Sequence, residues 1–381
     1  MDKTEPLLEI LLNKGSESIE TARQWGPCIT AIGGGTGLST MLRGIKEATA
    51  NITAIVTVSD DGGSSGILRQ DQGMLPPGDI RNCVMALANT EPIMEQLLNY
   101  RFTAGTLGGH SFGNLFLAAL NAICPSFDEA VARMNQVLAV TGRVLPVTTA
   151  DTWLEAEFEN GAKVLGESKI FYAKKEQKCR ISHIKMIPEN APALPDALTA
   201  IEQADLIVLG PGSLYTSVIP NLLVQDVAGA IRESKALRIY VCNIMTQEGE
   251  TEGYTAYDHV HELLSHGDDN LVDVCLVNSA AVPEDVLNRY EIERAWPVII
   301  DRDRFVRPGF PALIERPLYG HGKDYARHDP SKLAYEIFRI FCEKHPREGV
   351  YEEIDAFILQ WLKTKSINYA SYANNLQRHS L

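Results

Sequence analysis

The sequence lacks several features that assign a function directly. Its seven cysteines stand singly with no Cys-x-x-Cys pair, which disfavours zinc-finger and thioredoxin chemistry and fits a reduced, cytosolic protein. Lys and Arg total 35 against 49 Asp and Glu, a net charge of −14, which disfavours nucleic-acid binding. No apolar run approaches membrane-spanning length, and the amino terminus lacks a signal-peptide pattern. We expect a cytoplasmic protein that binds neither nucleic acid nor membrane.

What is present is an ordinary globular composition. The 381 residues are 45% hydrophobic and 22% charged, enough for an ample core in one large domain or two smaller ones. Residues 1–26 form an N-terminal extension with a short amphipathic helix, expected either to dock on the core or to fray. We expect an α/β domain over 27–345, with an antiparallel insert at about 150–185, and a C-terminal helix and tail over 346–381.

Apolar runs alternate with helical patterns along the central domain. The runs predict a Rossmann-like, doubly wound, mainly parallel sheet, with strands at 28–32, 51–58, 205–209, 238–242, 271–277 and 298–300. Helices are expected after the glycine turn at 33–37 and at 79–89, 92–100, 113–123, 127–140, 221–232, 256–265, 284–290, 331–343 and 351–362, with a loose tail beyond 364. In the insert, a strand at 153–158 precedes the turn Asn160-Gly161, and a second hairpin at 169–184 completes an antiparallel unit at the sheet edge.

The glycine turn at 33–37 is the sharpest local feature. It joins a predicted strand to a predicted helix, so its backbone N–H groups and the helix dipole favour an anion. It lacks the Lys-Ser/Thr ending of a Walker loop and does not fit G-x-G-x-x-G. The expected donors are the Thr36 hydroxyl and the amides of Gly34, Gly35, Thr36, Gly37 and Leu38; the alternative is a tight turn without a ligand.

A second loop, 59–66, follows the next strand and contains Asp60 and Asp61. Carboxyl ends of parallel strands share one rim, where a carboxylate can hold a ribose, bind Mg²⁺ or act as a base. We expect Asp60 to face inward. Gly62-x-Ser64-x-Gly66 matches a nucleophile elbow formally, but the serine falls several residues after the strand and no helix is expected directly behind it.

Further loops supply other candidates. In 77–82, Asp79 fits a helix cap, and Arg81 fits either a helix start or a contact with an anion. His110 and Asn114 lie at a glycine-flanked helix start, where a structural role for the histidine is an equal alternative. Strand ends add Gly212, Ser213 and Asn243. No nucleophile–base pair is evident.

At these residues the chain resembles the CofD-like family, and most closely its YvcK branch, the gluconeogenesis factors of bacteria. The matching stretches are AIGGGTGLSTMLRGIK, VTVSDDGGSSGILR, LPPGDIRNC, GHSFGNLFLAAL, GPGSLYTSVIPNLLV, NIMTQEGETEGY and RHDPSKLA. The resemblance implies a Rossmann-like fold that binds a nucleoside diphosphate group. By position, it makes pocket candidates of Gly34, Gly35, Thr36, Gly37, Asp60, Asn82, His110, Asn114, Gly212, Ser213, Asn243, Tyr290 and Arg327.

The two branches imply different functions. The YvcK branch implies a regulator that binds a nucleotide sugar such as UDP-N-acetylglucosamine and links carbon flux and gluconeogenic growth to cell-wall synthesis and cell shape. The CofD branch implies a Mg²⁺-dependent transferase that moves a phospholactyl-type group to a deazaflavin precursor, with Mg²⁺ on Asp60 and Asp61. The sequence GGSSGILR after the paired Asp, without an SPDxD-like stretch, departs from that branch.

We therefore expect a small nucleotide ligand and no obligatory cofactor, with NAD or GDP as surrogate ligands. A native NAD binder is a third alternative, disfavoured by the broken fingerprint. The protein partner and homo-oligomer formation stay open.

Overall fold

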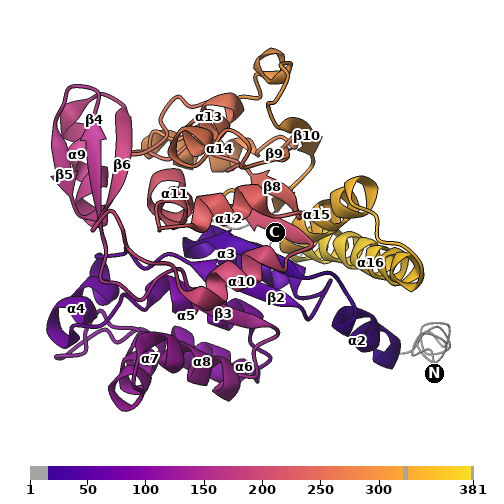
Figure 1. Cartoon of the computed structure of the whole chain (residues 1–381), viewed down its shortest axis with the longest axis horizontal. Coiled ribbons are helices and arrows are strands. Elements are labelled where there is room, and N and C mark those ends of the chain that lie inside the picture. The colour runs from indigo at the N-terminus through magenta and orange to yellow at the C-terminus, as the bar shows by residue number, and fades with distance from the viewer. Residues whose placement is uncertain (1–15, 321–324, 379–381) are drawn as a thin grey trace.

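A seven-stranded parallel sheet forms the centre of the computed structural model, which describes residues 16–320 and 325–378 (Figure 1). Every neighbouring pair of strands is parallel, which confirms the predicted α/β class. In spatial order the strands are β10 (Ala312–Arg316), β9 (Val274–Asn278), β8 (Leu237–Val241), β7 (Leu206–Leu209), β1 (Ile29–Gly33), β2 (Ile52–Val56) and β3 (Arg143–Pro146).

Helices cover both faces of this sheet, so its central strands are buried throughout. Ala31 and Ile32 of β1 belong to different core clusters, because successive side chains point to opposite faces. One cluster contains α3 (Gly35–Ile45), α5 (Gly78–Leu87), α8 (Phe127–Val137), α15 (Pro330–Lys344) and α16 (Val350–Arg378). The other contains α10 (Pro195–Glu202), α11 (Ile219–Leu222), α12 (Val227–Glu233) and α13 (Ala256–His266).

The order of the strands reverses between β1 and β7. From β1 the chain builds outward through β2 to β3, and from β7 it builds outward through β8 and β9 to β10. In open parallel sheets, ligands bind in the crevice beyond the carboxyl ends of the strands at such a switch point. The fold thus singles out the turns that follow β1 and β7.

Several predicted elements were wrong. The loop expected at 59–66 ends early, because helix α4 (Gly63–Gln72) begins within it. The helix expected at 221–232 is divided between α11 and α12, and a short π-helix, η1 (Leu214–Val218), precedes them. The expected strand at 298–300 makes only isolated bridges, whereas β10 was missed. The tail beyond 364 continues as helix α16 through Arg378. The remaining helices are α2 (Ser16–Gln24), α6 (Pro92–Asn99), α7 (Phe112–Ile123), α14 (Glu284–Ile292) and the 3-10 turn η2 (Arg302–Phe305).

The antiparallel insert forms a sheet of its own rather than extending the edge of the main one (Figure 1). Its strands are β5 (Lys163–Leu165), β4 (Trp153–Phe158) and β6 (Ile181–Ile187). The predicted second hairpin at 169–184 is wrong, because the helix α9 (Glu167–Gln177) leads into β6. A further pair of short strands, β11 (Tyr319–Gly320) and β12 (Arg327–His328), lies near the C-terminal helices. In the described ranges, no helix has the length and apolar character needed to cross a bilayer.

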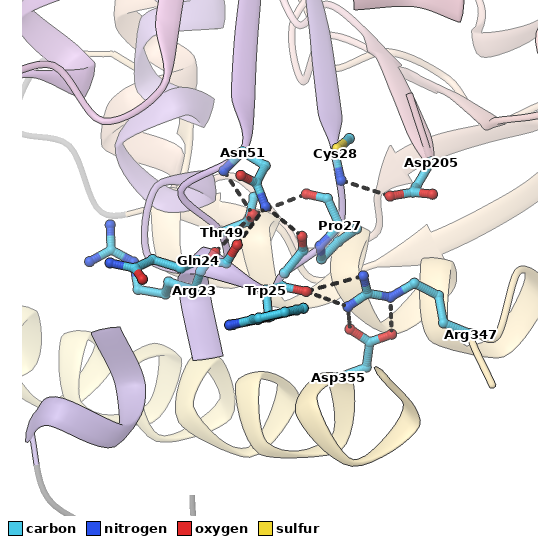
Figure 2. Close-up of polar contacts among 11 residues, drawn as sticks. Arg23, Gln24, Trp25, Pro27, Cys28, Thr49, Asn51, Asp205, Arg347 and Asp355 are labelled. Atoms are coloured by element: carbon cyan, nitrogen blue, oxygen red, sulfur yellow. Dashed lines mark hydrogen bonds and ion pairs between the residues drawn. The ribbon is translucent and has the colours of Figure 1, made fainter. Parts of the chain in front are cut away.

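The amphipathic helix expected around residues 7–11 lies outside the described residues, and the following segment, expected to be a polar linker, contains helix α2. The carboxyl end of α2 docks on the core through backbone carbonyl groups (Figure 2). The Asn51 amide donates to the carbonyls of Gln24 and Gly26, and both terminal nitrogens of Arg347 donate to the Trp25 carbonyl at 3.2 Å. Arg347 also forms a bidentate ion pair with Asp355 of α16, whose carboxyl is almost fully buried. The carbonyls at the end of α2, which lack partners within the helix, therefore accept hydrogen bonds from Asn51 of the core and from Arg347, which Asp355 of α16 holds in place.

Replacing Arg347 with Ala should lower the free energy of unfolding by about 3 kcal/mol, because the buried Asp355 carboxylate then loses its partner. The matched control is Arg302→Ala, which removes an exposed bidentate pair with Glu315 and should cost under about 1 kcal/mol. Denaturant unfolding measures both. Equal losses would contradict the assigned role of the Arg347 pair.

Candidate functional site

The turns after β1 and β7 touch through their backbones. A Cβ atom added at Gly37 would lie 2.5 Å from the carbonyl oxygen of Pro211, and one added at Gly212 would lie 3.1 Å from the carbonyl oxygen of Gly34. Only glycine permits so close an approach. The two glycine turns, distant in sequence, therefore form one continuous backbone wall at the switch point.

A pocket of about 310 Å³ opens beside this wall. Its lining combines the two turns with the loop after β8 and with residues near β12. The lining residues are Gly35, Thr36, Gly37, Thr40, Pro211, Gly212, Ser213, Ser217, Asn243, Ile244, Met245, Thr246, Gln247, Tyr290, Tyr325, Ala326, Arg327 and His328. The lining therefore combines backbone, hydroxyl and amide groups with two aromatic rings and a guanidinium.

The structure brings eight of the sequence-predicted site residues together on this lining: Gly35, Thr36, Gly37, Gly212, Ser213, Asn243, Tyr290 and Arg327. The others lie elsewhere. The Leu38 side chain is fully buried in the core, Gly34 lies behind the turn, and Asn82 accepts a hydrogen bond from the neighbouring Arg81. His110 and Asn114 contact Ser64, and Asp60 and Asp61 lie in the loop before α4.

Asn243 holds the second glycine turn in place. Its Oδ1 accepts from the Gly212 N–H at 3.2 Å, and its Nδ2 donates to the Gly212 carbonyl at 2.8 Å. The Ser213 hydroxyl donates to Gln247 at 2.8 Å. The loop after β8 therefore shapes the turn after β7, and Asn243 is a positioning residue.

The aromatic side of the pocket is also pre-arranged. The Tyr290 hydroxyl accepts from the Ala326 N–H at 3.0 Å, and the Tyr290 and Tyr325 rings meet edge to face. The Arg327 side chain is exposed and lies near the Tyr325 ring. A fixed ring beside a free guanidinium suits a ligand with a planar group and a negative charge.

The sequence predicted that Asp79 caps helix α5, but in the structure Asp79 contacts the first glycine turn instead. The residue preceding α5 is Pro77, and Asp79 lies in the first turn of the helix. The Gly35 N–H donates to the Asp79 carboxylate, and a Cβ at Gly34 would lie 2.6 Å from Asp79 Oδ2. One amide expected to hold a ligand is therefore already bound by the protein.

Asp79 is one of four acidic side chains whose charges affect one another, here called the carboxyl cluster: Asp60, Asp79, Glu167 and Glu250. Burial, and then the neighbouring charge of Asp60, raises the pKa of Asp79 to about 6. Burial and the charges of Asp60, Asp79, Glu250 and Asp61 raise the pKa of Glu167, from the insert helix α9, to about 9. Near neutral pH the Glu167 carboxyl is therefore neutral while that of Asp79 is mostly ionised.

The carboxyl cluster is attached to the second turn through Glu250. The Thr216 hydroxyl donates to Glu250 Oε1 at 2.9 Å, and the Tyr215 N–H donates to the same carboxyl group. Burial nevertheless raises the pKa of Glu250 to about 7. Asp61, in contrast, turns toward the insert, where its carboxylate accepts from the Ser168 N–H at 2.7 Å.

Ser64 and His110 form a hydrogen-bonded pair that the sequence did not reveal. Ser64 Oγ lies 3.0 Å from His110 Nδ1 and accepts from Asn114 Nδ2 at 3.1 Å. The expectation that no helix begins near Ser64 was wrong, because α4 begins at Gly63. The elbow geometry still fails, since β2 ends at Val56, well before the serine.

Sequence reasoning also missed several lining residues: Thr40, Ser217, Thr246, Gln247, Tyr325 and His328. Thr246 and Gln247 follow Asn243 in the loop after β8. Their position at a strand end could therefore have predicted that they line the pocket, because the carboxyl ends of parallel strands share one rim. No sequence signal pointed to Tyr325, whereas His328 lies in the matching stretch RHDPSKLA, of which only Arg327 was named as a pocket candidate.

Replacing Gly37 with Ala should push the two turns apart, because the added methyl would overlap the Pro211 carbonyl. We expect a loss of about 2 kcal/mol in unfolding free energy. The control is Gly229→Ala in α12, where an added Cβ meets nothing within 4 Å and the substitution should gain up to about 1 kcal/mol. Thermal unfolding of both variants checks the contact; an unchanged Gly37→Ala variant would contradict it.

Glu250 should make stability depend on pH. Its pKa rises from 4.5 to about 7 on folding, so its ionisation penalises the folded state progressively as pH rises from 4.5 to 7. Relative to the Glu250→Gln variant, the wild type should lose about 3 kcal/mol of unfolding free energy across that window. Denaturant unfolding from pH 4.5 to 8 measures the difference. The exposed Glu176→Gln control should show no such trend.

Comparisons with known proteins agree with this architecture. The family model for 2-phospho-L-lactate transferase CofD matches residues 29–318. A relative from Thermoanaerobacterium thermosulfurigenes is 55% identical over 81% of this chain and 95% of its own length, and the gluconeogenesis factor of Bacillus subtilis is 46% identical over 83% and 99%. A crystal structure from Bacillus halodurans, described as a UPF0052 family member, is similar with a TM-score of 0.78 at 44% identity, covering 81% of this chain and 97% of that one. The chain therefore belongs to the CofD family and, within it, to the gluconeogenesis-factor (YvcK) group.

Proposed function

We propose that this protein is a cytoplasmic regulator that binds a nucleotide sugar of the UDP-N-acetylglucosamine type. The observation that supports this most is the backbone contact between the turns after β1 and β7, beside a pocket whose lining also holds two aromatic rings and an exposed guanidinium. That arrangement matches a nucleoside diphosphate, with the base against an aromatic ring and the phosphates against backbone donors.

The phosphate end of the ligand would lie at the start of α3. This eleven-residue helix leaves its first N–H groups without intrahelical partners, and its dipole favours negative charge there. Thr36 and Gly37 remain available as donors, whereas the Gly35 amide is bound to Asp79. Arg327 adds a charged donor from the other side of the pocket.

The regulatory role is proposed from the family and the ligand class. Relatives named gluconeogenesis factor support a link to gluconeogenic growth, and a cell-wall sugar nucleotide as ligand would connect carbon flux with wall synthesis and cell shape. A binding protein of this kind needs no obligatory cofactor. The geometry of the pocket identifies neither its protein partner nor its assembly with further copies of itself.

The alternative is a Mg²⁺-dependent transferase, which the matching CofD family model favours. Asp60 fits a metal ligand because its carboxylate is only partly buried, although Oδ1 already accepts from the Gly62 N–H at 2.9 Å. Asp61 fits poorly, since it accepts from Ser168. Among residues 16–320 and 325–378, no three acidic, cysteine or histidine side chains are placed to hold one metal. Mg²⁺ would therefore need phosphate oxygens of the ligand to complete its coordination and would neutralise the leaving phosphate.

Calorimetry measures the affinities for UDP-N-acetylglucosamine, GDP and NAD, with and without Mg²⁺, and so distinguishes the regulator from the transferase. We expect the UDP-sugar to bind most tightly and to be recovered intact. The Arg327→Ala variant should bind it tenfold to a hundredfold more weakly, because one charge-assisted contact is lost. Arg307→Ala, which removes an arginine packed on Tyr257 and Phe310 outside the pocket, is the matched control and should bind normally.

Two results would contradict the regulator. If the Arg327→Ala variant bound the UDP-sugar as tightly as the wild type does, the ligand would not bind in this pocket. Metal-dependent consumption of a nucleotide donor in the presence of a deazaflavin acceptor would favour the transferase.

A further inference from the structure

Helix α6 carries an apolar stripe that no other described part of the chain covers. Ile93, Leu97 and the C-cap Tyr100 recur at the spacing of one helix face, and they are 71%, 43% and 52% exposed. The one residue of α6 that is buried in the core is Leu98. Single exposed apolar residues are ordinary, whereas a contiguous exposed stripe marks an interaction surface.

The hairpin that follows α6 extends this apolar surface and is held in a fixed position. The Phe102 N–H donates to the His110 carbonyl at 2.9 Å, and the Phe112 N–H donates to the Tyr100 carbonyl at 2.8 Å. The Phe102 ring meets the Tyr100 ring edge to face, with their centroids 5.2 Å apart. Leu107, farther along the hairpin, is 44% exposed. The surface is therefore formed before any partner binds.

Charges of opposite sign lie at the two ends of the stripe. Glu91 directly precedes α6, and Arg101 follows the helix by two residues; both side chains are exposed. Arg101 donates to the Gly109 carbonyl, but among the described residues neither Arg101 nor Glu91 forms an ion pair. The helix surface is thus acidic at its start, apolar along its length and basic beyond its end.

We propose that this surface, consisting of Ile93, Leu97, Tyr100 and Leu107, binds the same surface of a second copy of the chain. The two α6 helices would lie antiparallel about a two-fold axis near Gln96. A two-fold interface requires a surface that is complementary to itself, and the charges beside α6 meet this requirement.

The sequence positions of the charges select the antiparallel arrangement. Glu91 and Arg101 are each five residues from Gln96, so each Glu91 lies opposite Arg101 of the second copy. A parallel arrangement would instead bring like charges together, which is unfavourable. The uncharged stripe lies between the two ion pairs, where Ile93 of one copy faces Tyr100 of the other.

The size of the surface predicts a weak dimer. A helix of eight residues is about 12 Å long, so α6 alone cannot bury the roughly 800 Å² per partner of a standard interface. The hairpin with Leu107 adds to the buried area, and the total falls at the low end for specific interfaces. We therefore expect a dissociation constant of about 10 µM, a value typical of association that depends on concentration.

The dimer would leave the nucleotide pocket open. Tyr290, which lines the pocket, belongs to α14, and Figure 1 shows α14 and α6 at opposite ends of the molecule. The inference therefore stands independently of the proposed ligand.

Sedimentation equilibrium of the full chain, from about 1 to about 200 µM, measures the association. Ile93→Glu should raise the dissociation constant at least about tenfold, because it places a charge in an apolar contact. The matched control is Ile292→Glu in α14, where the isoleucine is 84% exposed, and this variant should dimerise normally. Both side chains already lie in water, so thermal unfolding of both variants should match the wild type.

Charge reversal tests the arrangement of the two helices. Glu91→Arg and Arg101→Glu should each weaken the dimer about threefold or more, because each places like charges opposite one another at both ends of the interface. The double variant restores opposite charges and should return the dissociation constant to within about twofold of the wild-type value.

Three results would overturn the proposal. A chain that stays monomeric at about 200 µM does not bind a second copy, and its α6 surface would then belong to a different protein. A dimer that Ile93→Glu leaves unchanged forms through another surface. Single charge reversals that weaken the dimer without rescue by the double variant would contradict the antiparallel two-fold contact.

Discussion

The site depends on one contact, the backbone of the turn after β1 against the backbone of the turn after β7. Gly37 lies over the Pro211 carbonyl with no room for a side chain. This contact fixes the distance between two strand ends that belong to opposite halves of the sheet. The loop after β8 then reaches the same place, because Asn243 brackets both backbone groups of Gly212. The pocket is thus a consequence of strand order and of backbone approach.

The positions of these turns could be predicted from the sequence, for a physical reason. Short apolar runs at 28–32 and 205–209 each end in glycines, and the carboxyl ends of parallel strands share one rim. Nothing more than topology is needed to bring Thr36 and Ser213 to one pocket. The same reasoning placed Asp60 at this rim, but Asp60 is not part of the pocket lining, and its carboxylate lies near Gly78 instead.

The failures have a common cause, which is that tertiary contacts overrode local patterns. The glycine-rich start of α4 has low helix propensity, yet Ser64 in its first turn is fixed by His110 and Asn114 from a distant helix start. Asp79 fits a cap by sequence, but helix α5 begins one residue earlier and directs the carboxylate at Gly35. Strand β10 is an edge strand of intermediate burial without a clear apolar pattern, so no periodicity marked it.

The distribution of charge is compatible with the proposed anion site in a protein whose net charge is −14. Within the described lining, positive charge enters only through Arg327, and the remaining attraction comes from backbone N–H groups and the dipole of α3. Negative charge comes close to these donors at one point, because a Cβ atom added at Gly34 would lie 2.6 Å from Asp79 Oδ2. Burial and the charges of the neighbouring acids raise the pKa of Glu167 to about 9, so this carboxyl adds no further negative charge near neutral pH.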